Sequence, residues 1–148
     1  MHSHAYAREL CRAHGLAATH QRVVIYRAVT ARAGHYSPEE VYAAVRRQVP
    51  SISLATVYKN LKTFVACGML RELHPRGGPL RVDPTLQPHH HLVCTSCGSI
   101  SDVDAAWLAP LRPRQAAPGG FRVREFKIEA LGVCRECARR GSSPSLRS

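Results

Sequence analysis

Apolar residues recur at helical spacing in four stretches of the first half of the chain, and capping residues precede most of them. Residues 5–14 predict a short helix, and Thr19 is a candidate N-cap for a second. Ser37, followed by a proline and two glutamates, has the composition of a capping box. We therefore expect a third helix to start after Ser37 and to continue as far as Pro50.

The fourth helical stretch begins after Ser53, and Gly68 fits the position just past its end. Its apolar residues should face the core, which leaves a polar and basic face that can donate to phosphates and read base edges in a major groove. An ordinary amphipathic helix with a solvated basic face is the alternative interpretation. The candidate DNA-binding residues of this face are Thr56, Tyr58, Lys59, Asn60 and Lys62.

Two short runs that fit β-strands follow this helix. They span residues 69–74 and 79–83, and a glycine turn at Arg76-Gly77-Gly78 separates them, which predicts a β-hairpin. Helices, then a basic helix, then a basic-tipped hairpin is the order of a winged helix-turn-helix. Arg76, at the predicted tip, is a further candidate contact to phosphate or to the minor groove.

The second half of the chain shows strand patterns instead. Residues 84–88 hold two prolines and predict an extended hinge. Beyond it, residues 90–94, 99–102 and 121–131 read as strands. The expected fold is α+β: a winged-helix domain over residues 1–83, a small α/β domain over 89–140 and a disordered tail over 141–148.

Four of the six cysteines form two Cys-x-x-Cys pairs. These are Cys94 with Cys97 and Cys134 with Cys137. Each two-residue spacer lets both thiolates turn toward one ion, so the four predict a tetrahedral structural zinc site. The alternative is a thioredoxin-like redox pair, which needs a different strand–helix setting. Cys11 and Cys67, on predicted helices, are expected to be buried small hydrophobes.

Three consecutive histidines come immediately after the hinge. On a strand, His89 and His91 point to one face and His90 to the other, so His89 and His91 are the candidate ligands. Asp83 and Asp102 are near them in sequence, and His35 could join if the two domains fold toward each other. Imidazole and carboxylate ligands suit iron, manganese, nickel or zinc. A solvated histidine tract with no metal is the simpler alternative.

Charge and hydropathy narrow the class of protein. The chain has 21 Lys+Arg against 10 Asp+Glu, a formal net charge of +11, which favours a polyanionic partner such as nucleic acid. No apolar run is long enough to span a membrane, and the N-terminus has no secretory signal pattern. We therefore expect a cytoplasmic protein. Because no paired nucleophile and base and no phosphate loop occur, we do not expect an enzyme.

Three motifs together resemble the ferric uptake regulator (Fur) superfamily: SLATVYKNL at 53–61, HHHLVCTSCG at 89–98 and GVCRECAR at 132–139. The similarity runs from about residue 10 to 137. It implies a winged-helix domain, a hinge and a dimerisation domain. It also implies a homodimeric, metal-dependent repressor that binds a palindromic double-stranded DNA operator. The helix expected within residues 103–118 should be short, ending near Ala109, because Pro110 interrupts it.

Within this superfamily the chain is most similar to the peroxide-sensing (PerR-like) branch, where three histidines and two aspartates hold the regulatory metal. Iron-responsive relatives tend to carry glutamate where this chain has Asp83 and Asp102. The resemblance implies that the regulatory Fe(II) or Mn(II) is held by His35, Asp83, His89, His91 and Asp102.

The same resemblance implies a peroxide response. Bound Fe(II) would react with hydrogen peroxide, a ligand histidine, His35 or His89, would be oxidised to its 2-oxo form, and repression would end. The Mn(II) form would resist peroxide, and no other small-molecule substrate is expected. One alternative is an iron or manganese uptake regulator without peroxide chemistry. Another, from a different class, is a zinc-stabilised metal-trafficking or redox protein.

Overall fold

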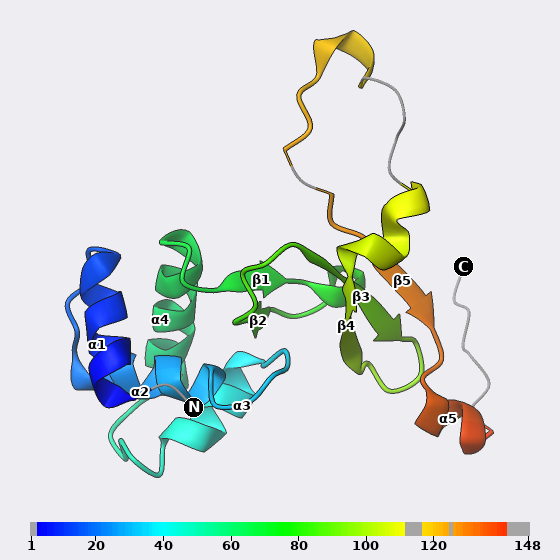
Figure 1. Ribbon diagram of the computed structural model, residues 1–148. Helices are drawn as coiled ribbons and strands as arrows, with labels where there is room; N and C mark the ends of the chain where they lie inside the picture. Colours follow the sequence, from blue (N-terminus) through cyan, green and yellow to red (C-terminus); the bar gives the residue numbers. More distant parts are fainter. Residues whose placement is uncertain (1–2, 112–116, 125, 142–148) are drawn as a thin grey trace. The chain divides into compact units, whose positions relative to one another are not determined.

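The computed structural model describes residues 3–111, 117–124 and 126–141. It separates into two compact units, residues 1–86 and residues 87–148. The first unit is mainly helical and the second is built on a small sheet (Figure 1). In the described part of the chain, no helix is long and apolar enough to cross a membrane.

Four helices form the N-terminal unit, and each follows a serine or threonine that caps it. The cap side-chain oxygen accepts a hydrogen bond from the backbone N–H three residues later, which satisfies a donor that the helix itself cannot. The predicted caps Thr19, Ser37 and Ser53 are therefore correct. The helices are α1 (His4–Ala13), α2 (His20–Val29), α3 (Pro38–Val45) and α4 (Leu54–Ala66).

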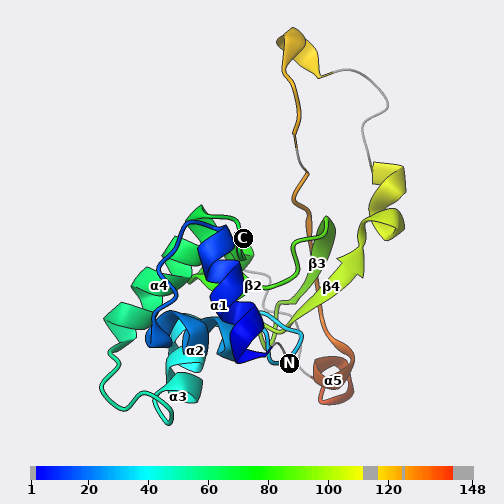
Figure 2. The ribbon, with the colours of Figure 1, turned by 60° about the vertical axis from the view of Figure 1, so that its left-hand side comes forward.

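The core of this unit is formed by apolar side chains of the four helices, which pack together in Figures 1 and 2. Phe64 and Leu61 from α4 and Ile25 from α2 are fully buried there. Tyr26 meets the Phe64 ring edge to face, with centroids 5.9 Å apart. Because α4 contributes its apolar face to this core, its opposite face is held outward.

A short antiparallel hairpin follows α4, as predicted. It consists of β1 (Arg71–Leu73) and β2 (Arg81–Asp83), with Leu73 opposite Arg81. A single 3-10 turn, Pro75–Gly77, forms its tip, and there Arg76 adopts a left-handed conformation with φ of 54°. The hairpin is the wing of the predicted winged helix.

A three-stranded sheet in the order β4-β3-β5 forms the C-terminal unit. Strand β3 (His89–Cys94) pairs antiparallel with β4 (Ile100–Asp104) and parallel with β5 (Glu129–Gly132). A short helix, α5 (Arg135–Arg139), follows β5. These elements and the winged-helix unit confirm the predicted α+β organisation.

Three predicted boundaries are wrong. Helix α3 ends at Val45, not at Pro50, because the chain turns tightly after it. Gln48 N–H donates to Val45 O, and Val49 still reaches the core at 7% exposure. In the C-terminal unit, the short helix that we expected to end near Ala109 is a 3-10 helix, Ala105–Leu111 (η2), which continues through Pro110.

The third wrong boundary is that of the last strand. Strand β5 covers only the end of the predicted segment 121–131, because its ladder with β3 begins where His91 pairs with Glu129. Residues 117–124, which include a 3-10 turn at Pro118–Gly120 (η3), lie away from the sheet in both views (Figures 1 and 2). Most of the predicted tail, 142–148, lies outside the described residues.

Candidate metal centres and DNA-binding surface

The four cysteines of the two Cys-x-x-Cys pairs meet in the C-terminal unit. Their sulfur atoms all lie within 4.8 Å of one another, and Cys97 Sγ is 3.8 Å from Cys134 Sγ. A tetrahedral zinc with bonds of about 2.3 Å separates its sulfurs by about 3.8 Å. The arrangement therefore fits one zinc ion held by Cys94, Cys97, Cys134 and Cys137.

Local backbone structure explains why the four sulfurs converge. After Cys94 ends β3, the chain turns back so that Gly98 N–H donates to Cys94 O, and Gly98 has φ of 73°. Strand β5 runs parallel to β3 with Gly132 opposite Cys94, which delivers Cys134 to the same end of the sheet. Helix α5 then places Cys137 one turn further on.

Hydrogen bonds lower the pKa of two of these thiols, which favours the thiolate form that binds a metal cation. The backbone N–H of Cys134 donates to Cys94 Sγ at 3.3 Å and lowers the pKa of Cys94 to about 6. Ser99 Oγ lies 3.2 Å from Cys97 Sγ and lowers the pKa of that thiol as well. The hydrogen bond of the Cys137 thiol with the Cys134 side chain holds the Cys137 proton and raises its pKa to about 12. A divalent cation bound by the four sulfurs would displace that proton.

The N-terminal unit holds one histidine–aspartate pair. His35 Nε2 lies 3.9 Å from Asp83 Oδ2, and both side chains are almost fully buried. The pair forms because the loop before α3 bridges to β2: Tyr36 and Val82 exchange two backbone hydrogen bonds of 3.0 and 2.9 Å. The other carboxylate oxygen, Asp83 Oδ1, accepts a hydrogen bond from Thr85 N–H at 2.7 Å.

The C-terminal unit holds a second cluster on the neighbouring strands β3 and β4. Asp102 lies opposite His91 in the ladder, and its Oδ1 is 3.6 Å from His89 Nε2 and 3.7 Å from His91 Nε2. His90 is buried on the other face, as strand alternation requires. His89 Nδ1 lies 2.7 Å from Gln87 O. Because a carbonyl can only accept, Nδ1 carries the proton and Nε2 carries the lone pair that a metal needs.

Both clusters have donor atoms suited to a divalent metal. Their nitrogen–oxygen separations exceed a hydrogen bond, and they are close to the roughly 3–3.5 Å between two ligands with bonds of about 2.1 Å to one ion. Imidazole nitrogen with carboxylate oxygen favours Fe(II) or Mn(II) over the thiolate-preferring metals. The structure thus brings the predicted residues together in two clusters, which we call the half-sites: His35 with Asp83, and His89 and His91 with Asp102.

The predicted DNA-binding residues on α4 and the wing differ in how exposed they are and in their contacts within the protein. Tyr58 and Lys59 are exposed, whereas Thr56 is half-buried, with Oγ1 2.8 Å from Ser53 Oγ. Lys62 is exposed but forms a 2.7 Å ion pair with Glu72 on the wing. Arg76 is exposed at the tip of the wing.

Asn60 is held by the protein itself. Its Nδ2 donates to Thr56 O at 2.8 Å, and its Oδ1 accepts from Arg22 Nε at 3.2 Å. Arg22, on α2, also donates to Ala17 O at 2.9 Å. The structure therefore places Asn60 among the residues that fix α4 on α2. Sequence reasoning missed Arg22, because nothing local links it to a helix that begins more than thirty residues later.

Comparisons with known proteins agree with this arrangement. Residues 13–131 match the model of the ferric uptake regulator family. The chain belongs to this family. It is 32% identical over 126 residues to the peroxide operon regulator of Bacillus subtilis, covering 85% of this chain and 87% of that protein. It is 32% identical over 123 residues to the peroxide-responsive repressor PerR of Staphylococcus aureus, covering 83% of each.

Solved structures of the ferric uptake regulator family match as well. The Vibrio cholerae ferric uptake regulator, whose crystal structure reveals rearrangement of its DNA-binding domains, aligns with a TM-score of 0.73. It is 26% identical and covers 86% of this chain and 98% of its own. A zinc-bound manganese uptake regulator aligns with a TM-score of 0.69 at 29% identity, with coverage of 86% and 98%.

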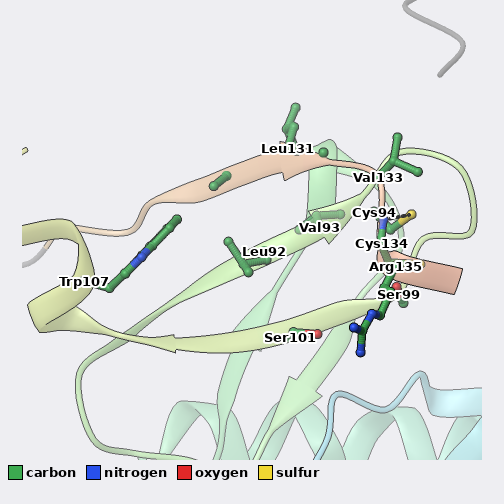
Figure 3. Close-up of a pocket in the computed structure, with 12 residues that line it drawn as sticks. Leu92, Val93, Cys94, Ser99, Ser101, Trp107, Leu131, Val133, Cys134 and Arg135 are labelled. Carbon is green, nitrogen blue, oxygen red and sulfur yellow. Dashed lines mark hydrogen bonds between the residues drawn. The ribbon is translucent and has the colours of Figure 1, made fainter. Parts of the chain in front are cut away.

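This member of the ferric uptake regulator family also has an open pocket of about 500 Å³ on its C-terminal sheet. Figure 3 shows Leu92 and Ser101 on the sheet, Trp107 at one end, and Cys134 and Arg135 at the other. Trp107 is 60% exposed, which is unusual for a tryptophan. Sequence reasoning assigned this tryptophan no role.

Replacing Lys59 by alanine should weaken duplex DNA binding and lower the slope of log affinity against log salt by about one. Lys59 is exposed and forms no ion pair among the described contacts, so folding should be unaffected. Fluorescence anisotropy across a salt series measures both quantities. Arg139→Ala on α5 is the charge-matched control; an equal loss there would mean that total charge, not α4, sets the affinity.

Proposed function

We propose that this protein is a metal-dependent transcriptional repressor that senses peroxide through Fe(II). The observation that carries the proposal is the pair of histidine–aspartate half-sites, one in each unit, both free of cysteine. His35 and Asp83 belong to the winged-helix unit, and His89, His91 and Asp102 belong to the sheet unit. A single ion that takes ligands from both would fix the two units relative to each other. The spacing of the winged helices for DNA would then depend on metal.

The winged-helix unit supports the DNA-binding part of the proposal. Its recognition helix α4 presents Tyr58 and Lys59 outward, and the wing carries Arg76. The net charge of +11 favours a duplex as partner. A relative named as a repressor and a solved relative described as having DNA-binding domains support the same role. We expect a palindromic operator, read by two copies of α4 in successive major grooves.

Zinc and a second copy of the chain complete the assembly that we propose. The four-cysteine cluster would hold a structural Zn(II) beside the sheet. Leu92, Trp107 and Leu131 expose large apolar surface on the same unit, at 37%, 60% and 58%. Soluble proteins rarely leave such a patch uncovered, and a two-fold homodimer is the commonest way to cover it.

The regulatory site would determine the response to peroxide. An Fe(II) ion held by these ligands would supply the activation of hydrogen peroxide. In the net reaction the O–O bond breaks, one oxygen atom is bonded to a ring carbon of His35 or His89, and the other leaves as water with the hydrogen from that carbon and the second peroxide proton. The imidazole is oxidised by two electrons and the peroxide is reduced by two. An oxidised ring no longer offers the same nitrogen lone pair, so its half-site would release the metal. Repression would then end, because the winged helices would lose their fixed spacing.

An iron or manganese uptake regulator without peroxide chemistry is the second candidate. The similarity to solved iron and manganese regulators favours it. The curated relatives at 32% identity favour the peroxide response instead. Both functions need the same metal clusters and the same DNA surface, so only the reactivity of the site separates them.

The deciding experiment loads purified protein anaerobically with Fe(II) or with Mn(II) and then adds low hydrogen peroxide. We expect the iron form alone to gain about one oxygen atom, on the peptide with His35 or the peptide with His89. Intact mass measurement followed by tandem peptide mapping locates it. His14 and His74, which belong to neither half-site, are internal controls. Metal-dependent DNA binding without any such gain would favour the uptake regulator.

A further inference from the structure

The loop that carries His35 is tied to the wing at several points. It follows Gly34, which has φ of 141°, and it has no regular secondary structure of its own. The Tyr36–Val82 bridge sets it antiparallel to β2. In that register His35 comes opposite Asp83, and Ser37, the N-cap of α3, comes opposite Arg81. The position of the histidine therefore depends on how firmly this short bridge is held.

Arg81 joins the two sides of the bridge through one nitrogen. Its Nη1 donates to the backbone carbonyl of His35 at 2.9 Å and to Glu40 Oε2 at 3.0 Å. The same Glu40 oxygen accepts from Ser37 N–H at 2.7 Å, and Ser37 Oγ accepts from Glu40 N–H at 3.2 Å. The guanidinium thus extends the capping box of α3 to the residue that would bind metal.

We propose that Arg81 is a positioning residue that couples metal occupancy at His35 and Asp83 to the start of α3. The inference rests on the proposed function. The planar guanidinium holds the His35 carbonyl and the Glu40 carboxylate in one geometry, which fixes the backbone from which the imidazole extends. A metal that pulls His35 toward Asp83 acts on the same backbone, and Arg81 transmits this constraint to the α3 N-terminus.

Helix α3 leads from this network to the DNA-binding surface. Val41 and Val45 of α3 are buried in the core that also holds Val57 and Leu61 of α4. A fixed N-terminus of α3 therefore restricts the helix against which the recognition helix packs. No contact between the two units is needed for this step.

A positioning role of Arg81 can be distinguished from a contribution to global stability and from a simple charge effect on metal binding. Its side chain is 30% exposed and that of Glu40 is 54% exposed, so solvent screens the ion pair and its loss should change global stability little. Removing a positive charge near a cation site should strengthen cation binding by electrostatics alone. If metal affinity falls when Arg81 is replaced, the change is therefore opposite to the one that the lost charge alone would cause.

The test uses the full chain with its zinc, and Mn(II) as the probe. In Arg81→Gln we expect Mn(II) affinity, measured by electron paramagnetic resonance titration without DNA, to fall about 10- to 100-fold. Zinc content and melting temperature should stay near those of the wild type. Glu40→Gln should cause a smaller loss, since its amide oxygen can still accept from Ser37 N–H while the ion pair is gone.

Hydrogen exchange tests the coupling itself. Mn(II) should slow amide exchange over the loop and the first turn of α3 in the wild type, and should do so much less in Arg81→Gln. Arg47→Gln is the matched control, because it removes the same charge just past the other end of α3, where Arg47 is exposed. Unchanged Mn(II) affinity in Arg81→Gln, or an equal loss in Arg47→Gln, would overturn the inference.

The outcomes also separate this inference from the proposed function. Wild-type protein that binds Mn(II), together with an Arg81→Gln variant that binds it equally well, would overturn only the role of Arg81. Wild-type protein that binds no Mn(II) outside its zinc site would overturn both.

Discussion

Replacing Cys134 by serine is expected to release the structural zinc and to unfold the C-terminal unit. A serine hydroxyl does not ionise near neutral pH, so it cannot replace a thiolate at a zinc ion. It also leaves Cys97 without the neighbour that lies 3.8 Å away. Zinc content by elemental analysis, thermal unfolding by circular dichroism and sedimentation together measure the loss.

The size of this effect follows from the thin core of the C-terminal unit. Among its described residues, the fully or nearly buried apolar side chains are Val93 and Leu108 together with Cys94 and Cys137 of the cluster itself. Small domains retain about 5–15 kcal/mol of stability, whereas a structural zinc contributes about 10–16 kcal/mol. The zinc is thus comparable to the whole stability of the unit, and the unit should not remain folded without it.

Cys67→Ser is the matched control for the loss of a thiol. Cys67 is half-buried at the end of α4, outside the cluster, and its Sγ donates to Phe64 O at 3.4 Å, a bond that a hydroxyl can also make. This variant should keep its zinc and unfold near the wild-type temperature. A Cys134→Ser protein that kept zinc and melted normally would contradict the structural role of the cluster.

Local patterns in the sequence predicted most of the winged-helix unit. Capping residues such as Ser37 and Ser53 act within three residues, and helical spacing assigned Leu61 and Phe64 to the core. The wing was found because its strands and its glycine turn are adjacent in the chain. Such features need no tertiary information, so a single sequence contains them.

The features that the sequence did not predict depend on partners far away in the chain. The length of β5 is set by its ladder with β3, which starts only at His91, and the 121–131 pattern does not record where that ladder begins. Likewise, the contacts of Arg22 with Asn60 and of Arg81 with Glu40 join residues about forty positions apart. The sequence around these two arginines does not distinguish them from arginines that are simply exposed to solvent.

The metal clusters fall between these two cases. The spacing of Cys94 and Cys97 fixes their geometry locally, and strand alternation separates His90 from His89 and His91. Asp102 pairs with His91 because a short turn joins β3 to β4. Such a turn can be recognised from the sequence. That His35 comes opposite Asp83 required the bridge from Tyr36 to β2, which no local pattern showed.

Asp102→Asn should abolish the effect of metal on DNA binding while sparing the zinc site. One carboxylate oxygen of Asp102 lies within 3.6 and 3.7 Å of two imidazoles, so its charge serves the whole C-terminal half-site. Asparagine keeps the shape but removes the anionic oxygen that Fe(II) and Mn(II) require. A typical allosteric coupling is about 5- to 150-fold, and in the variant this ratio should fall to about one.

Asp104→Asn provides the control on the same strand. Asp104 lies two residues further along β4, and its Oδ1 accepts from Ala106 N–H, which an amide oxygen can continue to do. It loses the same charge, so a general electrostatic effect would appear in both variants. If Asp102→Asn kept the full metal response, the proposed ligand set would be misplaced.

Reciprocity makes this prediction stricter than a single binding curve. If Mn(II) strengthens DNA binding by some factor, DNA must strengthen Mn(II) binding by the same factor. Mn(II) affinity measured with and without duplex should therefore give the ratio found from DNA affinity measured with and without Mn(II). A variant that lost only DNA contacts would keep its Mn(II) affinity, whereas Asp102→Asn should lose Mn(II) affinity and bind DNA as the metal-free wild type does.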